Sequence, residues 1–459
     1  MRRIWLLVLL FPLWSCSGSS SHSSPPPPPP GGSPLLLKAS SSHRYLVDQN
    51  NTPALLVGDS PHSMFVNLNS TDLATYLENR QEHGFNILWV QGLCSDYILN
   101  CRSDLSTYDG IKPFTSGTDE TNFDVSTPNS AYWSRVDNYV NTAANYGIVI
   151  LFDSWETGAL MPLARANGNS KMHDFGMFLG NRYKNFPNVI WITGNDFENW
   201  GEAADNALMQ NLMAGISAAD PNHLQTTELG PGASGSLDDP LLVPYTTLAG
   251  AYDYYCAYAE TLAQYNYPSP VPVPVFFEEG FYEYRGTIHN LRTQAWWASL
   301  AGATAGQMYG SENIYPFLPG WQSFLDTTGV TEFGYLNSLL HSLKWYNLIP
   351  DQSHEIVTSG YGTLDTSENG SCINANDYVT TSYLADGTAS VSYIPQGATV
   401  AVDLSKFSSP VTAKWYDPTS SSSITISGSP FANAGTQSFS TPGNNSAGDP
   451  DWVLLVTTN

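Results

Sequence analysis

Basic residues are scarce in this chain. Only 17 Lys and Arg oppose 41 Asp and Glu among 459 residues, which leaves a formal net charge of −24. Phosphate groups are bound by Lys and Arg, so this balance argues against nucleic acid and against an anionic membrane surface as partners. Charged residues of both signs reach only 13%, against 42% hydrophobic residues, which is typical of a globular protein with a large core.

Long apolar runs are also missing from the N-terminal part of the sequence. Ile4–Trp14 follows Arg2 and Arg3 and is too short to span a membrane comfortably, which is the pattern of an export signal over residues 1–16. The run ends in "LWSC", a lipobox-like end that makes Cys16 the candidate lipidation site, with an ordinary secretory signal as the alternative. Residues 17–42 are rich in Ser and Pro and predict a tether.

We therefore expect an extracytoplasmic protein that is lipid-anchored to a bacterial outer membrane or cell surface. It would touch the membrane only through that anchor.

Cysteine is limited to five residues, and Cys16 is assigned to the anchor. Cys94 and Cys101 flank the short loop "CSDYILNC" and are close enough in sequence to pair. Cys256 with Cys372 then follows by elimination, although four cysteines allow three connectivities. No His or Cys lies at ligand spacing near either pair, so we expect no metal and no organic cofactor.

Aromatic residues, by contrast, are abundant at 13%, with 13 Trp and 26 Tyr. Most of them belong in a core, but a surplus on a weakly charged protein also suits stacking against sugars. The chain is longer than one average domain, so one large domain and a smaller one are expected.

Apolar runs alternate with amphipathic segments from residue 43 onward, the rhythm of a parallel α/β fold. Eight such strand–helix units predict a (β/α)8 TIM barrel over residues 43–350. The fifth and sixth strands are the weakest, being short and polar. The predicted strands cover residues 54–59, 85–91, 147–153, 188–196, 224–229, 248–254, 273–279 and 305–310.

The pattern changes at residue 351. A last barrel helix, "TEFGYLNSLLHSLKWYNLIP", is predicted to stop at Pro350. Residues 351–459 then show only short alternating runs separated by Gly, Ser, Asn and Pro clusters. They predict a small antiparallel β-sandwich.

Acidic residues stand at the predicted carboxyl ends of several strands, where a barrel of this type builds its active site. Asp196 and Glu279 come from the fourth and seventh strands, so they can face each other across the mouth. Hydrolysis of a glycosidic bond needs two such carboxyl groups, one protonated and one ionised. The full set of acids at strand ends is Asp59, Asp153, Asp196, Asp253, Glu278 and Glu279.

Several stretches of the chain resemble the apiosidase-like glycoside hydrolases. "HRYLVDQNNTPALLVGDSPHSMF" and "YLENRQEHGFNILWVQ" are similar to the opening of that barrel, and the tail from Leu404 is similar to the β-sandwich, labelled collagen-binding, that follows it. "NVIWITGND" and "PVFFEEGFYE" resemble the family's motifs on strands 4 and 7. The resemblance implies Asp196 as acid/base and Glu279 as nucleophile in a retaining double displacement.

Two positions depart from the family pattern. Asn195 stands where the family more often has Gly, and the Asn–acid pair resembles that of the wider retaining barrel clan, where the Asn binds the substrate's 2-hydroxyl. Glu278 likewise replaces a common Gly before Glu279. Adjacent strand residues point to opposite faces, so only one of the two can face the mouth. Glu279 is favoured by its place ahead of "GFYE", and Glu278 is the alternative.

Each catalytic assignment has a structural competitor. Asp196 could cap a helix that begins near Trp200, in which case Glu198 would be the acid. Glu279 could instead form an ordinary ion pair with Arg285 or Arg292.

Five further residues are candidates for substrate binding, each with an alternative. Asp59 and His62 either bind sugar hydroxyls or belong to a buried polar network. Asp153 and Trp155 either form a subsite wall or pack in the core. Tyr309 either supports the nucleophile or is a core residue.

The sequence as a whole predicts an exported monomeric glycoside hydrolase acting on a plant- or microbe-derived oligo- or polysaccharide. A non-catalytic glycan-binding surface lipoprotein on a barrel scaffold is the alternative, and adhesion through the sandwich is a third possibility. The family's name implies apiose from a pectic side chain as the sugar. Residues 94–123, after the second strand, are long enough to reshape the cleft.

Overall fold

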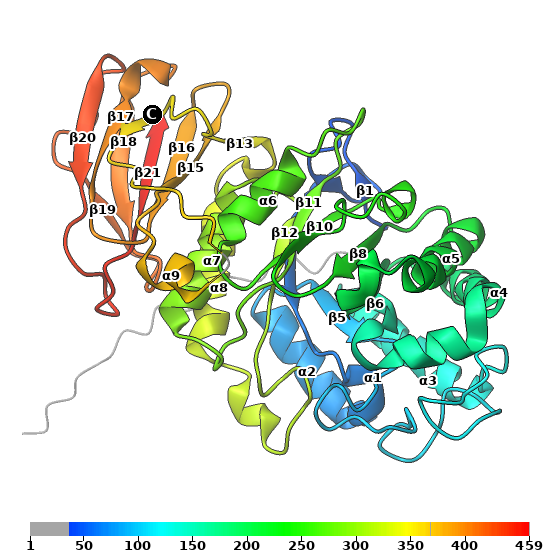
Figure 1. Ribbon diagram of the computed structural model, residues 1–459. Coiled ribbons are helices and arrows are strands. Elements are labelled where there is room, and N and C mark those ends of the chain that lie inside the picture. Colours follow the sequence, from blue (N-terminus) through cyan, green and yellow to red (C-terminus); the bar gives the residue numbers. More distant parts are fainter. Residues whose placement is uncertain (1–35, 368, 459) are drawn as a thin grey trace, which may run out of the picture.

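The computed structural model describes residues 36–367 and 369–458. It contains a barrel and a smaller β-sandwich packed beside it (Figure 1). Cys16 and most of the predicted tether lie outside the described residues. The described fold begins within the stretch predicted as tether, because Leu37 is buried and β1 (Lys38–Ala39) pairs with β2 (Leu46–Val47). No helix among the described residues is long and apolar enough to cross a membrane.

The eight predicted barrel strands are all present, so the (β/α)8 prediction is confirmed. They hydrogen-bond in parallel in the order β8-β7-β6-β5-β4-β12-β11-β10, and β9 (Ala233–Gly235) adds antiparallel to β10. The backbone amides of Thr247 and Leu248 donate to the Gln225 carbonyl where β8 and β10 meet. The strands are β4 (Leu56–Asp59), β5 (Ile87–Gln91), β6 (Val149–Glu156), β7 (Val189–Phe197), β8 (Gln225–Leu229), β10 (Ala249–Asp253), β11 (Val275–Glu279) and β12 (Gly306–Tyr309).

Alternate residues of these strands fill the barrel. Leu56, Trp89, Leu151, Ile192 and Phe276 belong to one buried cluster inside it, and the residues between them face the helices. This alternation is the period of a strand, with one face turned to each side of the sheet. The lower part of the barrel is therefore apolar, and polar side chains are concentrated at the mouth.

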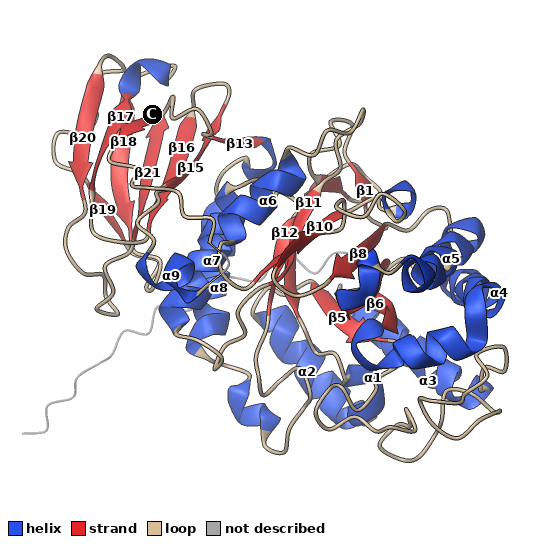
Figure 2. Cartoon of the chain, viewed as in Figure 1, coloured by secondary structure: helices blue, strands red, loops and turns tan. Residues whose placement is uncertain are grey.

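Helices surround the sheet (Figure 2). α2 begins after Asn69, whose side chain caps the helix by accepting hydrogen bonds from the amides of Thr71 and Asp72. The helices are α1 (Met64–Asn67), α2 (Ser70–Glu82), α3 (Ser130–Asn145), α4 (Thr157–Tyr183), α5 (Ala203–Ala219), α6 (Ala257–Tyr265), α7 (Ile288–Leu300), α8 (Thr328–His341) and α9 (Gly370–Ala375).

The C-terminal unit is an antiparallel β-sandwich, as predicted. One sheet has the order β13-β15-β16-β21-β18-β19 and the other β14-β17-β20. Its strands are β13 (Leu348–Pro350), β14 (Val357–Ser359), β15 (Thr380–Leu384), β16 (Ala389–Ile394), β17 (Thr399–Asp403), β18 (Val411–Tyr416), β19 (Ser423–Thr425), β20 (Thr436–Ser440) and β21 (Trp452–Thr458). A third small sheet, at the start of the barrel, adds β3 (Pro53–Ala54) to β1 and β2.

Three sandwich strands were not predicted. β20 is mostly exposed and polar, with Phe439 as its buried residue, so it carries little apolar signal. β14 is only three residues long. β13 lies in the segment predicted as the end of the last barrel helix: α8 stops at His341, and Leu348–Pro350 pairs with β15 instead.

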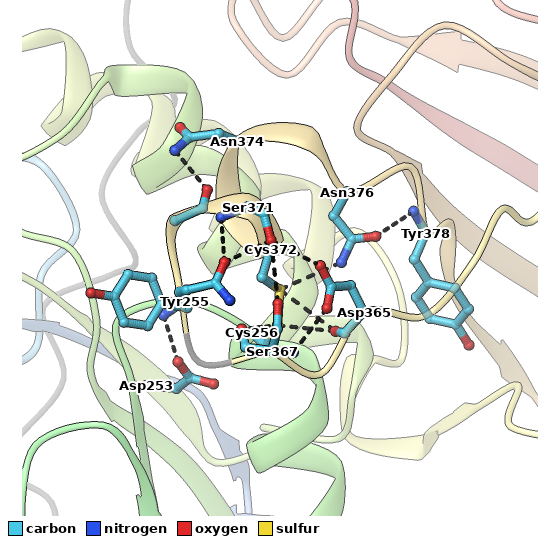
Figure 3. Close-up of a disulfide and its surroundings, with 12 residues drawn as sticks. Asp253, Tyr255, Cys256, Asp365, Ser367, Ser371, Cys372, Asn374, Asn376 and Tyr378 are labelled. Atoms are coloured by element: carbon cyan, nitrogen blue, oxygen red, sulfur yellow. Dashed lines mark hydrogen bonds between the residues drawn. A yellow bond between two sulfur atoms is a disulfide. The ribbon is translucent and has the colours of Figure 1, made fainter.

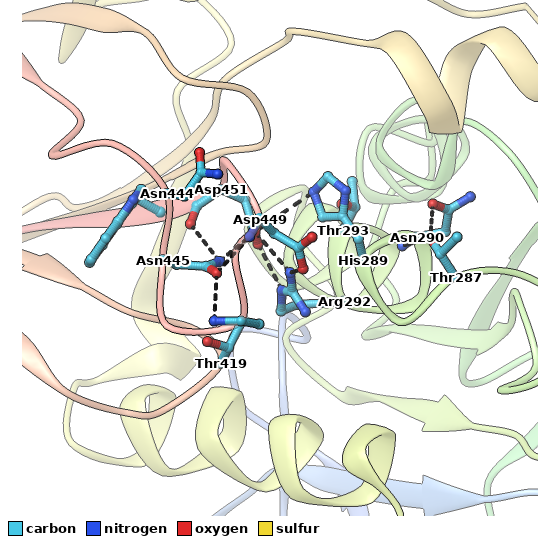
Figure 4. Close-up of polar contacts among 12 residues, drawn as sticks. Thr287, His289, Asn290, Arg292, Thr293, Thr419, Asn444, Asn445, Asp449 and Asp451 are labelled. Atoms are coloured by element: carbon cyan, nitrogen blue, oxygen red, sulfur yellow. Dashed lines mark hydrogen bonds and ion pairs between the residues drawn. The ribbon is translucent and has the colours of Figure 1, made fainter.

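Arg292 joins the barrel to the sandwich (Figure 4). It lies on α7, is almost fully buried, and donates to Glu332 at 2.7 Å, to Asp449 at 2.7 Å and to Asp451 at 2.7 and 2.8 Å. The Tyr393 hydroxyl also donates to Asp451 at 2.9 Å. One guanidinium thus compensates carboxylates from both units.

Disulfides tie two further segments. Cys256, at the start of α6, is bonded to Cys372 of α9, which links the barrel to the chain leading into the sandwich (Figure 3). Cys94 is bonded to Cys101 in the loop after β5. Both disulfides are the pairs that the sequence predicted.

Replacing Arg292 should destabilise the whole chain. Arg292→Met leaves three carboxylates without their buried cation, and we expect a loss of about 3–5 kcal/mol, measured by urea unfolding at neutral pH with Trp fluorescence. The matched control is Lys406→Met, which breaks the exposed Lys406–Glu355 ion pair and should not measurably change the midpoint. Equal midpoints for the two variants would contradict this role of Arg292.

Candidate active site

β7 ends in a bulge at the mouth of the barrel. Its pairing with β8 is regular through Thr193 and resumes at Phe197, so residues 194–196 oppose the single residue Glu228. A bulge of this kind bends its strand and turns side chains to new directions. The sequence motif "GND" is therefore the bulge itself.

The bulge depends on an unusual backbone. Gly194 has φ 136°, and a Cβ atom on it would lie 2.1 Å from the Glu228 carbonyl oxygen, so only glycine fits. Asn195 and Asp196 both have φ 58°, in the left-handed region that few non-glycine residues adopt. Asn and Asp tolerate this region better than most residues. Such strain persists where the surroundings hold it in place.

The Asp196 side chain projects from the bulge and accepts hydrogen bonds from two tyrosine hydroxyls. Tyr97 donates to Asp196 Oδ2 at 2.5 Å and Tyr252 donates to Oδ1 at 2.9 Å. Tyr97 comes from the loop closed by the Cys94–Cys101 disulfide, so the insert after β5 reaches the acid directly. The Asp196 carboxylate itself is partly exposed to solvent.

Asp196 caps no helix, so that structural alternative is wrong. The short 3₁₀ turn that follows, Glu198–Gly201, has Phe197 at its N-cap, and α5 has Glu202. Glu198, the substitute acid, is exposed in that turn.

Glu279 lies at the end of β11 and is 6% exposed. Tyr254 donates a short hydrogen bond to its Oε1, and the Tyr282 hydroxyl lies 3.4 Å from its Oε2. Arg285 does not replace these donors: its hydrogen bonds go to the Tyr254 hydroxyl at 2.7 Å and to Glu312 at 2.6 Å. The other arginine considered as an ion-pair partner, Arg292, is engaged at the sandwich.

Asp196 and Glu279 act on each other electrostatically. Burial, and after it the charge of Asp196, raises the pKa of Glu279, whereas the Tyr254 hydroxyl and the charge of Arg285 oppose that rise. Geometry links them too: Tyr252 donates to Asp196, Tyr254 donates to Glu279, and the two tyrosine rings lie 5.3 Å apart between centroids, although the strands of the two acids lie on opposite parts of the rim.

Glu278 points into the barrel below the mouth. It is fully buried against Gly250 of β10, where a Cβ atom would lie 1.8 Å from Glu278 Oε2. Burial, followed by the charge of Glu279, raises the pKa of Glu278 well above its usual value. Alternation thus places Glu278 inside the barrel, and Glu279 reaches the mouth where the β10–β11 register shifts between Ala251 and Tyr252.

Asn195 and His62 lie directly behind these carboxyl groups. Asn195 is buried, with its Oδ1 accepting from Gln91 at 2.7 Å and its Nδ2 lying 3.4 Å from Glu228. His62 Nε2 lies 3.0 Å from the Tyr282 hydroxyl, and burial lowers the pKa of His62 to about 3, which keeps the ring neutral. Both residues are buried beside the site and hydrogen-bonded to its polar groups, and their contact with a substrate hydroxyl stays a prediction.

Four predicted substrate-binding residues are buried away from the mouth. Asp59 accepts hydrogen bonds from Tyr76 and Arg80, both at 2.6 Å, and forms the buried network that was its alternative. Asp153 is fully buried and accepts from the Trp155 amide at 3.0 Å. Trp155 is also buried and packs on Phe175 with ring centroids 6.0 Å apart. Tyr309 is buried as well; it packs on Phe85 and Phe333 and donates to Glu283.

Sequence reasoning missed two buried acids. Glu228 ends the weakly predicted fifth strand, and the only signal was one acid in "LQTTEL". Glu156 lies beyond the predicted end of the third strand at residue 153; it accepts from the Ser95 hydroxyl at 2.6 Å and from the Ala159 amide at 2.8 Å. Burial raises the pKa of Glu156 to about 7.

The tyrosines at the mouth were missed as well. Tyr97, Tyr252, Tyr254 and Tyr282 supply the hydroxyl groups that bind Asp196 and Glu279. A Tyr-rich composition signals such roles only collectively, because most tyrosines pack in cores. Within residues 36–367 and 369–458, no group of three or more His, Cys, Asp or Glu is arranged to hold a metal ion.

Comparison with known proteins identifies the family of the barrel. Residues 40–347 match the model of a family described as "Apiosidase-like, catalytic domain". Residues 369–457 match a second one, described as "Putative collagen-binding domain of a collagenase". A comparison with the curated proteins found no match.

Solved structures share the fold across both units. A structure titled "Glycoside hydrolase" is 22% identical with a TM-score of 0.75, over 94% of this chain and 97% of that one. A glycoside hydrolase family 5 structure from Bacteroides vulgatus ATCC 8482 is 23% identical with a TM-score of 0.74, over 94% and 93%. At these identities the likeness concerns the fold.

The bulge at Gly194 can be tested without a substrate. Gly194→Ala forces a Cβ atom onto the Glu228 carbonyl oxygen at a positive φ, and we expect a loss of about 3 kcal/mol in urea unfolding. Gly201→Ala is the matched control, since a Cβ atom there meets open space. Wild-type stability of Gly194→Ala would contradict the bulge described here.

Proposed function

Since this chain belongs to the apiosidase-like family of glycoside hydrolase catalytic domains, we propose that it cleaves a plant- or microbe-derived glycan by retaining double displacement. Asp196 is the acid/base and Glu279 the nucleophile. The observation that supports this proposal is that two adjacent tyrosines, Tyr252 and Tyr254, donate to these two carboxyl groups, which come from opposite parts of the rim. A non-catalytic glycan-binding barrel would not require that convergence.

The first step forms a covalent intermediate. Glu279 attacks the anomeric carbon, the bond from that carbon to the leaving oxygen breaks, and Asp196 gives its proton to that oxygen. In the second step Asp196 takes a proton from water. The resulting hydroxide equivalent attacks the anomeric carbon, and the ester to Glu279 breaks.

The surroundings of each carboxyl group suit its role. Burial and the charge of Asp196 raise the pKa of Glu279 to about 8, and the hydroxyl donors Tyr254 and Tyr282 orient it, with Tyr254 opposing that rise and favouring the ionised nucleophile. Asp196 is partly exposed, so it can exchange its proton with solvent between the two steps. Tyr97 and Tyr252 fix its direction.

The substrate and location extend this proposal. Apiose in pectic oligosaccharides is the first sugar to test, because the family description names an apiosidase. Export and the lipid anchor at Cys16 are proposed from the N-terminal sequence, and a monomeric state is proposed alongside them.

The catalytic pair is tested by three variants. Glu279→Gln should abolish turnover, and Asp196→Asn should lower kcat by about 10²–10⁴-fold because the leaving oxygen is no longer protonated. Glu198→Gln, which alters an exposed acid two residues away, is the matched control and should keep wild-type activity. Activity is measured as sugar released from pectic oligosaccharides, with thermal midpoints to verify folding.

The configuration of the first product tests the mechanism. Nuclear magnetic resonance spectra recorded immediately after mixing should show the anomer of the substrate. The opposite anomer would identify an inverting enzyme with water between the acids. Loss of activity in Glu198→Gln together with an active Asp196→Asn would move the acid to Glu198. Binding of glycans without any hydrolysis would support the glycan-binding alternative.

A further inference from the structure

Glu228 is a third carboxyl group at the site and has no role in the mechanism above. It lies at the end of β8, opposite the bulge of β7, and is 0% exposed. Its Oε2 accepts the backbone N–H of Asp196 at 2.9 Å and lies 3.4 Å from Asn195 Nδ2. Asn195 and Asp196 are the two residues of the bulge with a left-handed backbone, each at φ 58°. Two side chains therefore hold the strained bulge: Glu228 accepts the Asp196 N–H, and the Thr157 hydroxyl donates to the Gly194 and Asn195 carbonyls.

Glu228 also contacts Glu279. The two carboxyl groups are within hydrogen-bonding contact, and this contact favours the ionised form of Glu279. A hydrogen bond between two carboxyl groups requires a proton on one of them, because two buried carboxylates in contact repel each other. Glu228 Oε1 is buried and receives no hydrogen bond from the described residues, so it is the atom left to carry that proton.

The surroundings decide which group holds the proton. Burial, followed by the charges of Glu279, Asp196 and Glu278, raises the pKa of Glu228 well above its usual value. Burial and the charge of Asp196 raise the pKa of Glu279 as well, to about 8, but the Tyr254 hydroxyl, the charge of Arg285 and the hydrogen bond with Glu228 oppose that rise, and Glu228 has no such cation.

The ionisable groups that face Glu228 from neighbouring elements offer it no positive charge. They belong to β7, β10, β11 and the segment after β11, and they are Asp196, Tyr252, Glu278, Glu279 and Tyr282. Tyr252 and Tyr282 direct their hydroxyls at Asp196 and Glu279. A proton is what compensates Glu228 in this cluster.

We propose that Glu228 is a positioning residue that works as a neutral acid. Its Oε1–H donates to Glu279 and keeps the nucleophile ionised and oriented, while its Oε2 accepts the Asp196 N–H and fixes the acid/base on the bulge. One buried carboxyl group thereby sets the relative position of both reacting groups. This inference rests on the roles proposed for Asp196 and Glu279.

The variant Glu228→Gln distinguishes a positioning role of Glu228 from a role in proton transfer. Glu228→Gln keeps one donor and one acceptor in nearly the same shape as a protonated carboxyl group, but it cannot give up a proton. Glu228→Leu keeps the approximate volume and removes both hydrogen bonds. We compare kcat and KM of both variants with wild type between pH 5 and 9, on the oligosaccharide that wild type cleaves.

We expect Glu228→Gln to retain kcat within about threefold, since both hydrogen bonds survive. Glu228→Leu should lower kcat by about 10²–10³-fold, the usual effect of removing an oriented donor, with little change in KM. An inactive Glu228→Gln that is folded would overturn the proposal, because Glu228 would then have to ionise during turnover. A fully active Glu228→Leu would overturn it as well.

Infrared spectroscopy tests the protonation without any substrate. The wild-type minus Glu228→Gln difference spectrum at neutral pH should contain the C=O band of a protonated carboxyl group, shifted in D₂O. Carboxylate bands in its place would overturn the proposal even if Glu228→Leu fails to fold. Failure of the proposed function would look different: Asp196→Asn and Glu279→Gln would remain active while this band was still present.

Discussion

The hydrogen bond from the Asp196 backbone N–H to Glu228 is the interaction on which the mouth of the barrel depends. Three residues of β7 face one residue of β8 there, and a backbone with two consecutive left-handed non-glycine residues would not persist without a partner inside the barrel. That partner must be buried, because the bulge closes over it. The partner is the carboxyl group of Glu228, and because it is buried away from solvent its negative charge must be compensated within the protein.

Tyrosine hydroxyls and protons, rather than cations, meet that constraint. The buried guanidinium groups of Arg80 and Arg292 are used elsewhere, on Asp59 behind β4 and on the carboxylates of the sandwich interface. A cation directly on a carboxylate would hold it ionised over the whole working pH range. Hydroxyl donors orient Asp196 and Glu279 while leaving their protonation free to change. The shortage of Lys and Arg in the sequence thus corresponds to a site built from neutral donors.

The strands and the placement of Asp196 and Glu279 at the mouth could be predicted from the sequence because both follow from simple rules: apolar runs form the barrel, and acids at strand ends lie at its mouth. The sequence left the places of Asp59 and Tyr309 open between the mouth and the core because a strand end can face either side. The preceding residues, Gly58 and Met308, lie on the inner face of their strands. The side chains of Asp59 and Tyr309 therefore lie on the outer face, towards the helices. Glu228 escaped prediction because the bulge opposite it depends on how two strands pair, which the residue pattern of one strand does not contain.

The sandwich is connected to the active site through α7. The segment from Glu279 to α7 carries Tyr282 and Arg285, which act on the nucleophile, and α7 is anchored to the sandwich by Arg292 and by the stacking of Trp296 on Tyr393. Any shift of α7 would move the donors of Glu279 with it, and a misplacement of about 1 Å is enough to cost a large part of the rate. The β-sandwich can therefore be required for the chemistry without touching the substrate, because it holds the helix that follows Glu279.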